Sequence, residues 1–234
     1  MIPTDLRLSV VIPTLDEAAT VGDLLSDLRT LTAPHEVIVA DGGSTDETVP
    51  IAQATGARVV RTPTGRGVQL RAGAAVASAP LLCFLHADVR LDAEAAARLS
   101  ELAETPPAFA CAFRLRIEAR GVLYRLVEAG ANRRTQLFGL PYGDQGLVVR
   151  RQHYDAAGGY PAISLMEDVA LAGALREITR LHLLDEAVGV SPRRWRREGV
   201  LRRTLTNWML LGRYLAGASP ERLAKHYRPE VPRD

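Results

Sequence analysis

Two side chains that could do chemistry, His86 and Asp88, come directly after a short apolar run at residues 81–85 (LLCFL). Such a run predicts a buried strand. An imidazole and a carboxylate at its end could hold a metal ion or a phosphate group, and they could equally form a turn or a helix cap. The segments that follow the other strands decide between these interpretations.

Polar or acidic residues also follow three further apolar runs. The segments are PTLDE at 13–17, DGGSTD at 41–46 and TGRG at 64–67. In an open parallel sheet, ligands bind beyond the carboxyl ends of the strands, so these segments would meet at one edge. Taken singly, Asp-Gly-Gly is a turn, and Asp16 or Asp46 could cap a helix. Four such segments together are not explained by turns alone, and they predict a binding site.

The first half of the chain alternates short apolar runs with stretches of helical spacing. We expect strands at 8–13, 36–40, 57–61 and 81–85, and helices at 16–29, 47–55, 68–78 and 92–104. Asp92 is expected to cap the last of these helices. Strands that are apolar on both faces and alternate with helices predict a mostly parallel sheet covered on both sides, which is an α/β fold.

The second half departs from this alternation. We expect a strand at 108–118, antiparallel or at an edge, followed by a helix at 121–137, a strand at 146–150, a helix at 166–176, a strand within 181–190 and a helix at 201–215. No clear linker separates the halves, so a single domain over 1–234 is predicted. In the last helix, Leu205, Trp208 and the leucines up to Leu215 are expected to pack onto the sheet. The arginines of this helix would also suit a membrane interface.

The composition is that of an ordinary globular protein, with 47% hydrophobic and 24% charged residues and a net charge of +2. A charge this small argues against general binding to nucleic acid. Cys83 and Cys111 give neither a disulfide framework nor a zinc spacing, which fits a reducing compartment. Residues 1–8 have no secretory pattern, and no run of ~18 apolar residues exists. We therefore expect a cytoplasmic protein, with contact at the inner membrane face as the alternative.

Known motifs disfavour several classes of nucleotide-binding protein. A dinucleotide-binding dehydrogenase would carry G-x-G-x-x-G after the first strand, where this chain has PTLDEA. A P-loop needs a lysine, and the only lysine is Lys225. A sugar-nucleotide nucleotidyltransferase would also have a Gly-rich loop after the first strand, and the only such loop here follows the third.

Longer segments carry a specific resemblance. SVVIPTLDEAATV, VIVADGGSTDET and the strand ending in HAD resemble the nucleotide-binding half of a family 2 glycosyltransferase with the GT-A fold. PYGDQGLVVRR, GGYP, LMEDVAL and SPRRW resemble a subgroup of small bacterial enzymes, the arsenosugar-biosynthesis-like or radical-SAM/selenodomain-associated transferases. The resemblance covers roughly residues 8–228. It implies a nucleotide-binding half at 1–105 and an acceptor-side half, with an antiparallel extension, at 106–234.

The resemblance implies donor-binding roles for four residues of the first half, and the sequence around Arg66 suggests a fifth. The residue matching Asp41 pairs with the nucleobase, and those matching Pro13, Thr14 and Glu17 line the nucleoside pocket. Arg66 lies between two glycines in a loop and suits a phosphate clamp. Each of these residues also has a plain structural interpretation, as a turn aspartate or a solvated loop arginine.

A metal site is implied at Asp88, which matches the last aspartate of the D-x-D motif. That aspartate coordinates Mn²⁺ or Mg²⁺ on the donor diphosphate, where the cation stabilises the charge of the departing phosphate. His86 replaces the first aspartate of the motif. The histidine could contact the ribose or bind the metal, and the replacement puts the identity of the metal in doubt.

The acceptor side is implied by residues of the second half. Asp168 matches the general base that takes the acceptor proton, and Glu167 matches its partner in orienting the acceptor. Asp144 and Gln145 precede a strand and suit hydroxyl recognition, or form a turn. We expect the RRW motif on a loop. Its Arg194 would pair with the diphosphate, and its Trp195 would cover the acceptor.

The resemblance predicts a metal-dependent inverting glycosyltransferase. The donor would be a nucleotide-sugar, UDP-sugar first, and the acceptor a hydroxyl of a small molecule. One alternative keeps the fold but uses a polyprenyl phosphate or another lipid acceptor at the membrane surface. The other is a nucleotide-sugar binding protein without catalysis, which the presence of both Asp88 and Asp168 disfavours.

Overall fold

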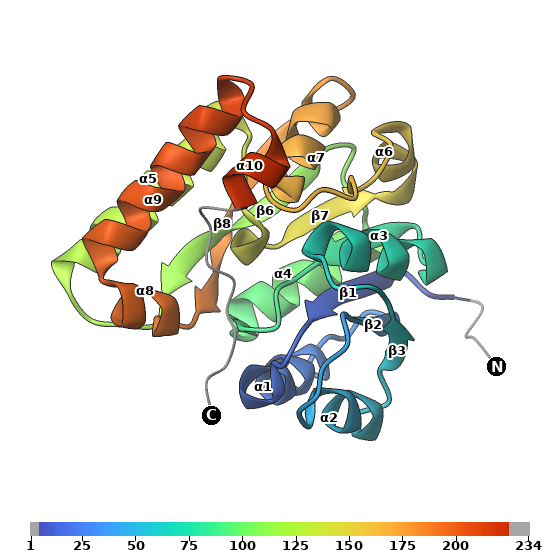
Figure 1. The fold of residues 1–234 in the computed structure, drawn as a ribbon. Coiled ribbons are helices and arrows are strands. Elements are labelled where there is room, and N and C mark those ends of the chain that lie inside the picture. The colour runs from blue at the N-terminus through green and yellow to red at the C-terminus, as the bar shows by residue number, and fades with distance from the viewer. Residues whose placement is uncertain (1–4, 225–234) are drawn as a thin grey trace.

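The computed structural model describes residues 5–224. Within them, strands form one mixed sheet in the order β3-β2-β1-β4-β7-β6-β8-β5 (Figure 1). Helices pack on both faces of this sheet. The arrangement confirms the predicted α/β class.

The first half supplies the parallel part of the sheet. Its strands are β1 (Leu8–Thr14), β2 (His35–Asp41), β3 (Arg58–Arg61) and β4 (Leu81–Phe84), and its helices are α1 (Ala18–Leu28), α2 (Thr48–Ala54), α3 (Arg66–Val76) and α4 (Ala93–Glu104). β1 pairs in parallel with β2 and with β4, and the last residue of β1, Thr14, lies opposite Asp41. The carboxyl ends of these strands therefore share one edge, as predicted.

The second half completes the sheet and adds the longest helices. Its elements are β5 (Val89–Leu91), β6 (Ala110–Ile117), α5 (Val122–Phe138), the 3₁₀ turn η1 (Gly143–Gln145), β7 (Leu147–Arg150), α6 (Arg151–Ala156), α7 (Glu167–Arg176), β8 (Leu181–Val190), α8 (Arg193–Glu198), α9 (Val200–Leu215) and α10 (Pro220–Ala224). β6 is antiparallel to β7 and parallel to β8, so it lies inside the sheet. Of the two alternatives predicted for this strand, the antiparallel one is confirmed by the pairing with β7, and the edge one is wrong, because β8 and β5 continue the sheet beyond β6.

Two apolar layers cover the faces of the sheet. Successive side chains of a strand point to opposite faces. Val10 and Ile12 of β1 accordingly join the core under α1 and α4, whereas Val11 joins the core under α3, α6 and α7. A smaller cluster, which includes Val169 and Leu210, joins α7 to α9. The central strands β1 and β4 are therefore buried on both faces, as their sequences predict, whereas the edge strand β3 is only partly buried.

Several element boundaries differ from the prediction. α1 begins at Ala18 rather than at residue 16, because Asp16 has a left-handed φ of 52° that no helix contains. Asp92 caps α4 as expected, accepting from the backbone N–H of Ala95 at 3.0 Å. β5, α6 and α8 were not expected, since elements of three to six residues are too short to give a periodic pattern. The RRW motif, expected on a loop, begins α8.

The packing of α9 also differs from the prediction. Leu210 and Leu211 are buried, but Leu205, Trp208 and Leu215 are 68%, 47% and 64% exposed. Only one side of this helix faces the protein, because α9 lies on the outside next to α5 (Figure 1). Among residues 5–224, no helix is long and apolar enough to cross a bilayer.

Candidate active site

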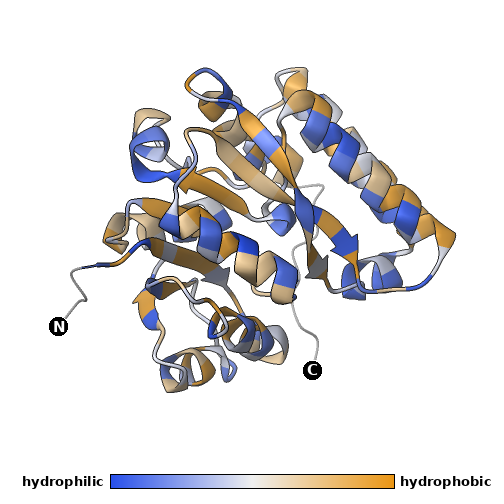
Figure 2. Cartoon of the chain, turned by 180° about the vertical axis from the view of Figure 1, so that it is seen from behind, coloured by the Kyte–Doolittle hydropathy of each residue, from blue (hydrophilic) through white to orange (hydrophobic). Residues whose placement is uncertain are grey.

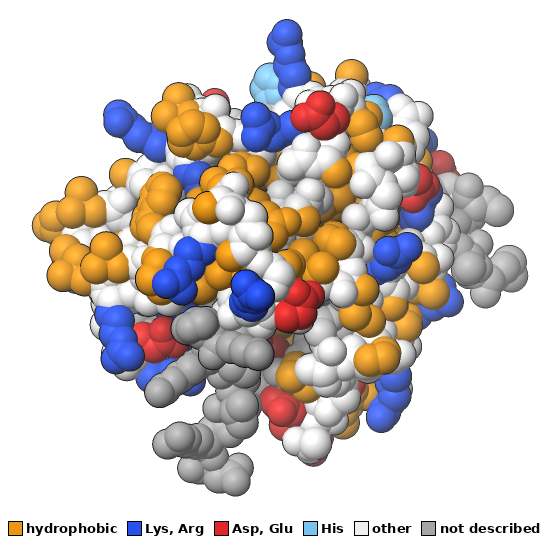
Figure 3. Space-filling model, turned by 45° about the horizontal axis from the view of Figure 1, so that its top comes forward, with side chains coloured by type: hydrophobic (Ala, Val, Ile, Leu, Met, Phe, Trp, Pro, Cys, Tyr) orange, Lys and Arg blue, Asp and Glu red, His pale blue; other side chains and the backbone are white. Residues whose placement is uncertain are grey.

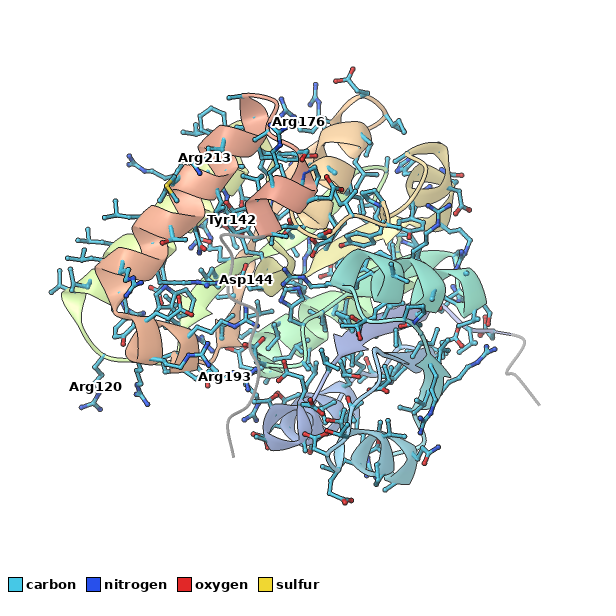
Figure 4. The ribbon with its side chains drawn as sticks, viewed as in Figure 1. Arg120, Tyr142, Asp144, Arg176, Arg193 and Arg213 are labelled. Carbon is cyan, nitrogen blue, oxygen red and sulfur yellow. The ribbon has the colours of Figure 1, made fainter. Side chains whose placement is uncertain are left out.

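A cleft follows the carboxyl ends of β1 and β4 and continues beneath α9. Two adjoining hollows form it, and Arg66, His86 and Asp88 line both of them. The first, which we call the β1 hollow, is also lined by residues 13–15 and 17. The second, the α9 hollow, is also lined by Tyr142, Asp144, Asp168, Trp195 and Asn207. In Figure 4, Tyr142 and Asp144 lie between α9 and the sheet. The structure thus brings together residues from both halves of the chain.

Glu17 contributes a partly buried carboxylate to the β1 hollow. Its Oε2 accepts from Arg193 at 2.6 Å and from the hydroxyl of Thr20 at 3.0 Å. Burial raises the pKa of Glu17, and the Arg193 guanidinium opposes that rise. Pro13 and Thr14, the other residues implied for a nucleoside pocket, line the same hollow. The structure therefore brings the three residues together, and their role in binding a nucleoside stays a prediction.

Asp41 lies beneath this hollow and does not line it. Its carboxylate is fully buried and accepts from Thr14 Oγ1 at 3.3 Å and from the backbone N–H groups of Gly43 and Ser44 at 3.1 Å each. The hydroxyl of Ser44 donates a further hydrogen bond. These contacts hold the loop after β2, so a bond from Asp41 to a nucleobase would require the loop to move. That role remains a prediction.

Gln69, on α3, holds the floor of the β1 hollow together. Its Nε2 donates to the backbone carbonyls of Thr14 and Ala40 at 2.7 and 2.9 Å, which joins the ends of β1 and β2. Its Oε1 accepts from the N–H of Gly65 at 3.4 Å. This role could not be predicted from the sequence, because no pattern indicates that a glutamine on a helix points inward.

His86 and Asp88 both reach the cleft, from the turn between β4 and β5. Burial lowers the pKa of His86 well below its ordinary value, and the charges of Arg66 and Arg194 add to the effect. The imidazole is therefore neutral near pH 7. Its ring lies against Gly143, where a Cβ atom would be 2.2 Å from His86 Nε2. A glycine at this position is consequently required by the close approach of the ring.

Arg193, in the first turn of α8, lies beside two acidic residues of the β1 hollow, Glu17 and Asp88. Its guanidinium lies 2.6 Å from Glu17 Oε2 and 3.8 Å from Asp88 Oδ2. Figure 4 shows Arg193 on α8, beside the carboxyl end of the parallel strands. The RRW motif therefore contributes its first arginine to carboxylates of the cleft, a contact that the sequence did not predict.

Arg66 and Glu167 form an ion pair beside the cleft, and Glu167 itself lines neither hollow. The Nε of Arg66 donates to Oε1 of Glu167, whose side chain is 2% exposed. Gly67 makes this approach possible, because a Cβ there would lie 2.3 Å from the carbonyl oxygen of Pro161. Arg66 also lines both hollows, so the same side chain contacts Glu167 and borders the cleft.

Asp168 is the strongest candidate for a general base. It lies in the first turn of α7, and its carboxylate accepts from the N–H groups of Gly143 at 3.0 Å and Val169 at 2.8 Å. Burial raises its pKa to about 6, the charge of Glu167 adds to the rise, and Arg66 opposes it. A carboxylate with a pKa near the working pH can both accept a proton and release it.

Asp144 and Gln145 are adjacent in the sequence, but only Asp144 has its side chain in the cleft. Asp144 lines the α9 hollow, and burial raises its pKa. Gln145 is fully buried and points away from the cleft, where its Oε1 accepts from Arg134 at 3.0 Å and from Thr135 Oγ1 at 2.6 Å. Gln145 thus holds η1 against α5. Its position does not support the predicted role in binding an acceptor.

Arg134 and Tyr142 were not predicted and form the wall beside Asp144. The guanidinium carbon of Arg134 lies 3.5 Å from the centroid of the Tyr142 ring. Burial raises the pKa of Tyr142 to about 12, so its hydroxyl stays protonated. The stacked pair gives the α9 hollow a rigid aromatic surface.

Arg194 and Trp195, predicted for the diphosphate and the acceptor, both line the cleft. Arg194 lines both hollows, and Trp195 lines the α9 hollow. Trp195 is 7% exposed, and its Nε1 has no hydrogen-bond partner among residues 5–224. A buried indole N–H normally has a partner, so this donor is available to a bound molecule.

The residues of the cleft fit a divalent cation that takes most of its oxygen donors from a bound nucleotide and from water. In the described part of the chain, no three His, Cys, Asp or Glu side chains gather into a metal site. Mg²⁺ bound to a nucleotide needs only one or two carboxylates, with phosphate oxygens and water completing the shell. Asp88 lines both hollows, and its charge helps to raise the pKa of Asp144. The oxygen donors present therefore match those such a cation prefers.

Comparison with known proteins identifies the class. Residues 9–164 match the family described as glycosyl transferase family 2, and the chain belongs to that family. An uncharacterized glycosyltransferase of Mycobacterium bovis is 35% identical over 86 residues, which cover 36% of this chain and 38% of that protein. The match thus spans well under half of the relative's own length.

Solved structures show the same fold. TarS from S. aureus superposes with a TM-score of 0.64 at 18% identity, covering 88% of this chain and 64% of that one. Mannosyltransferase PcManGT from Pyrobaculum calidifontis, in complex with GDP-Man and Mn²⁺, gives a TM-score of 0.63 at 17% identity, covering 92% and 66%. These similarities support the GT-A arrangement of the sheet and its helices.

Proposed function

We propose that this chain transfers a sugar from a nucleotide-sugar, with UDP-sugar as the first candidate, to a hydroxyl group of a small-molecule acceptor, with inversion at the anomeric carbon. The observation that carries the proposal is that Asp88 and Asp168 line the same hollow. In this proposal the chain works as one domain, residues 1–105 binding the nucleotide and 106–234 the acceptor.

The donor would occupy the β1 hollow. Thr14 and Glu17 would contact the nucleoside, and the arginines Arg66 and Arg194 would lie along the diphosphate, since guanidinium groups pair well with phosphate oxygens. The neutral His86 would contact the ribose as an uncharged hydrogen-bonding group. TarS has also been solved with UDP-GlcNAc and PcManGT with GDP-Man, so both pyrimidine and purine donors are candidates.

Asp88 would hold Mn²⁺ or Mg²⁺ against the diphosphate. The cation would neutralise the charge that develops on the leaving phosphate. Asp88 is suited to this role because it lines both hollows and is only 8% exposed, so its carboxylate is largely shielded from bulk water.

Asp168 would remove the proton from the acceptor hydroxyl. The two backbone N–H groups that it accepts from hold the carboxylate in one orientation. The acceptor oxygen would then attack the anomeric carbon on the face opposite the nucleotide, through an oxocarbenium-like transition state. One displacement gives inversion, and no second carboxylate nucleophile is needed.

Thermal unfolding with nucleotides tests the donor site. UDP, GDP, CDP and dTDP are each added with and without Mn²⁺ to the native protein, to Asp88→Ala and to a control variant, Asp185→Ala, whose side chain is 95% exposed. Ligand at 100 times its Kd should add about 2.7 kcal/mol of stability. A metal-dependent shift for one nucleotide that is lost only in Asp88→Ala is the expected result. No shift with any nucleotide would contradict the proposal.

Turnover separates the enzyme from a protein that only binds nucleotide-sugar. Release of the nucleoside diphosphate from the donor, lost in Asp168→Asn while nucleotide binding is kept, supports catalysis. Binding without release of product from any donor would support the binding protein instead.

A further inference from the structure

An apolar surface on α5 and α9 is left uncovered. All but one of the large hydrophobic side chains exposed in the described chain belong to these two helices. They are Val122, Leu123, Leu126, Leu137 and Phe138 on α5, and Leu201, Leu205, Trp208, Met209 and Leu215 on α9. The remaining one, Ile178, lines a shallow groove with Leu137 and Phe138. We call this surface the α5/α9 face.

The two helices form one continuous surface. α5 and α9 lie side by side, and a Cβ atom at Gly130 of α5 would be 4.0 Å from Cζ2 of Trp208 of α9. Figure 3 shows hydrophobic side chains gathered on this side of the molecule, with arginines among them. Monomeric proteins rarely expose a contiguous apolar patch of this kind without a function.

α9 is two-sided. At about 100° per residue, its exposed apolar side chains fall within roughly a third of the helix circumference. The opposite side carries Arg203 and Leu210, which are 7% and 1% exposed and line the α9 hollow. Figure 2, seen from behind, shows a mixture of hydrophobic and hydrophilic positions along the neighbouring helix α5. One side of α9 therefore serves the cleft, and the other has no partner among residues 5–224.

The exposed charges on these helices are all positive. Arg125 and Arg133 of α5 and Arg202 and Arg213 of α9 are exposed. The one acidic residue of either helix, Glu128, is 9% exposed and accepts from the backbone N–H of Ile117. The exposed side chains of α5 and α9 therefore include leucines, a tryptophan and arginines but no carboxylate, which is complementary to anionic lipid head groups. The exposed carboxylate of Glu177 lies at the edge of this face, in the groove with Ile178, beside Arg176 and Arg180.

We propose that the α5/α9 face docks on the surface of an anionic lipid bilayer. The leucines would enter the boundary between head groups and acyl chains, Trp208 would lie at head-group depth, and the arginines would pair with lipid phosphates. A second copy of the chain fits this face less well. A symmetric contact would bring two surfaces of the same positive charge together.

Docking would place the cleft close to lipid. The α9 hollow lies on the inner side of the same helix, and a helix with its side chains is about 10 Å across. The inference goes beyond the proposed transferase activity, and binding to vesicles can be measured without any sugar transfer. Failure of one proposal therefore leaves the other open to its own test.

Flotation of the whole chain with vesicles tests the proposal. Vesicles of phosphatidylcholine with about 30% phosphatidylglycerol are compared with vesicles of phosphatidylcholine alone. The variant Leu201→Glu/Leu205→Glu changes side chains that are 63% and 68% exposed, so the fold is preserved. The control Gln53→Glu/Ala54→Glu makes the same change in charge at exposed positions of α2.

The expected result is binding to the anionic vesicles that falls about tenfold in the α9 variant and stays close to native in the α2 control. Arg202→Gln/Arg213→Gln should weaken binding and reduce its dependence on salt. Three outcomes would overturn the proposal. They are no binding of the native chain, equal loss in the α2 control, and a dimer in solution that the α9 variant dissociates.

Discussion

Arg66 and Glu167, 101 positions apart in the chain, form an ion pair directly beside Asp168. The pair joins the amino-terminal end of α3 to that of α7. It also places one positive and one negative charge next to the candidate base, which act on its pKa in opposite directions. Burial is the main cause of the raised pKa of Asp168, and this contact between α3 and α7 adjusts it.

The first prediction concerns the pH dependence of catalysis. Since burial and Glu167 raise the pKa of Asp168 to about 6, kcat/KM should fall as the pH decreases through about 6, by about tenfold per pH unit below it. Asp168→Asn should lower kcat by about 10²–10⁴ and should remove this acidic limb. Initial rates measured between pH 4.5 and 8.5, roughly the range in which most proteins stay folded, would give this pH dependence.

Two variants test the origin of that limb. Glu167→Gln removes the neighbouring negative charge and should move the limb to lower pH. Arg66→Gln removes the opposing positive charge and should move it to higher pH. Shifts in the same direction in both variants would contradict control of Asp168 by this ion pair.

The second prediction is that Asp168 lowers the stability of the protein above its pKa. The folded pKa is raised from an ordinary 3.8 to about 6, so between these values the folded state binds more protons than the unfolded state. Stability contributed by this group is thus full below pH ~4 and is lost as the pH rises through ~6. The difference corresponds to about 3 kcal/mol.

Asp168→Asn should therefore stabilise the protein at pH 7.5 by about 1–3 kcal/mol, and by much less at pH ~4. The lower end of the range allows for one hydrogen bond that the amide cannot accept. Urea unfolding at both pH values measures the gain. Asp155→Asn, at an exposed position of α6, is the control and should change stability little at either pH. An equal gain at both pH values would exclude the proton linkage.

The third prediction compares two helical glycines. In Gly67→Ala the new Cβ would lie 2.3 Å from the carbonyl of Pro161, and neither the helix nor that backbone can yield easily. The variant should lose about 1–3 kcal/mol of stability and weaken the contact between Arg66 and Glu167. In Gly173→Ala, within α7, the Cβ would meet no atom within 4 Å. That variant should gain about 0.5–1 kcal/mol, because alanine favours a helix. Similar unfolding midpoints for the two variants would contradict the close approach at Gly67.

The parallel half of the fold could be predicted from the sequence because its strands are apolar on both faces. That pattern requires helices on both sides, and a parallel sheet then brings the polar segments after β1 and β4 to one edge. The gathering of Glu17, Arg66, Asp88 and Asp168 in one cleft follows from the same reasoning together with the family resemblance.

The other features of the site could not be predicted, because they depend on the direction in which side chains and helix faces point. Asp41 lies opposite the cleft residue Thr14 in the sheet, but its side chain turns inward to Ser44. Gln145 follows the cleft residue Asp144 in the sequence, but its side chain turns inward to Arg134. Local sequence does not reveal which way a polar side chain of a loop points. α9 is apolar on two sides, so its spacing predicted a buried helix and could not indicate that only one side is covered.

The fourth prediction concerns Gln69. Gln69→Leu removes both hydrogen bonds that join the carbonyls of Thr14 and Ala40, at a cost of about 1–3 kcal/mol. Since the ends of β1 and β2 form the floor of the β1 hollow, the KM for the donor should rise more than kcat falls. Gln53→Leu, at an exposed position of α2, is the control and should leave both unchanged. A loss of kcat with an unchanged KM would contradict a role in shaping the donor site.

The last prediction concerns the indole N–H of Trp195. This donor is buried without a partner in the described chain and lines the α9 hollow, so we expect it to bond to the acceptor. Trp195→Phe keeps an aromatic ring and removes the donor. The KM for the acceptor should rise about tenfold, as expected for the loss of ~1.4 kcal/mol, while nucleotide binding stays unchanged. Trp208→Phe is the matched control, because Trp208 is 47% exposed and does not line the α9 hollow. Equal effects of both substitutions on the acceptor would mean that the ring of Trp195 supports the packing of α8 and α9 and that its N–H takes no part in binding.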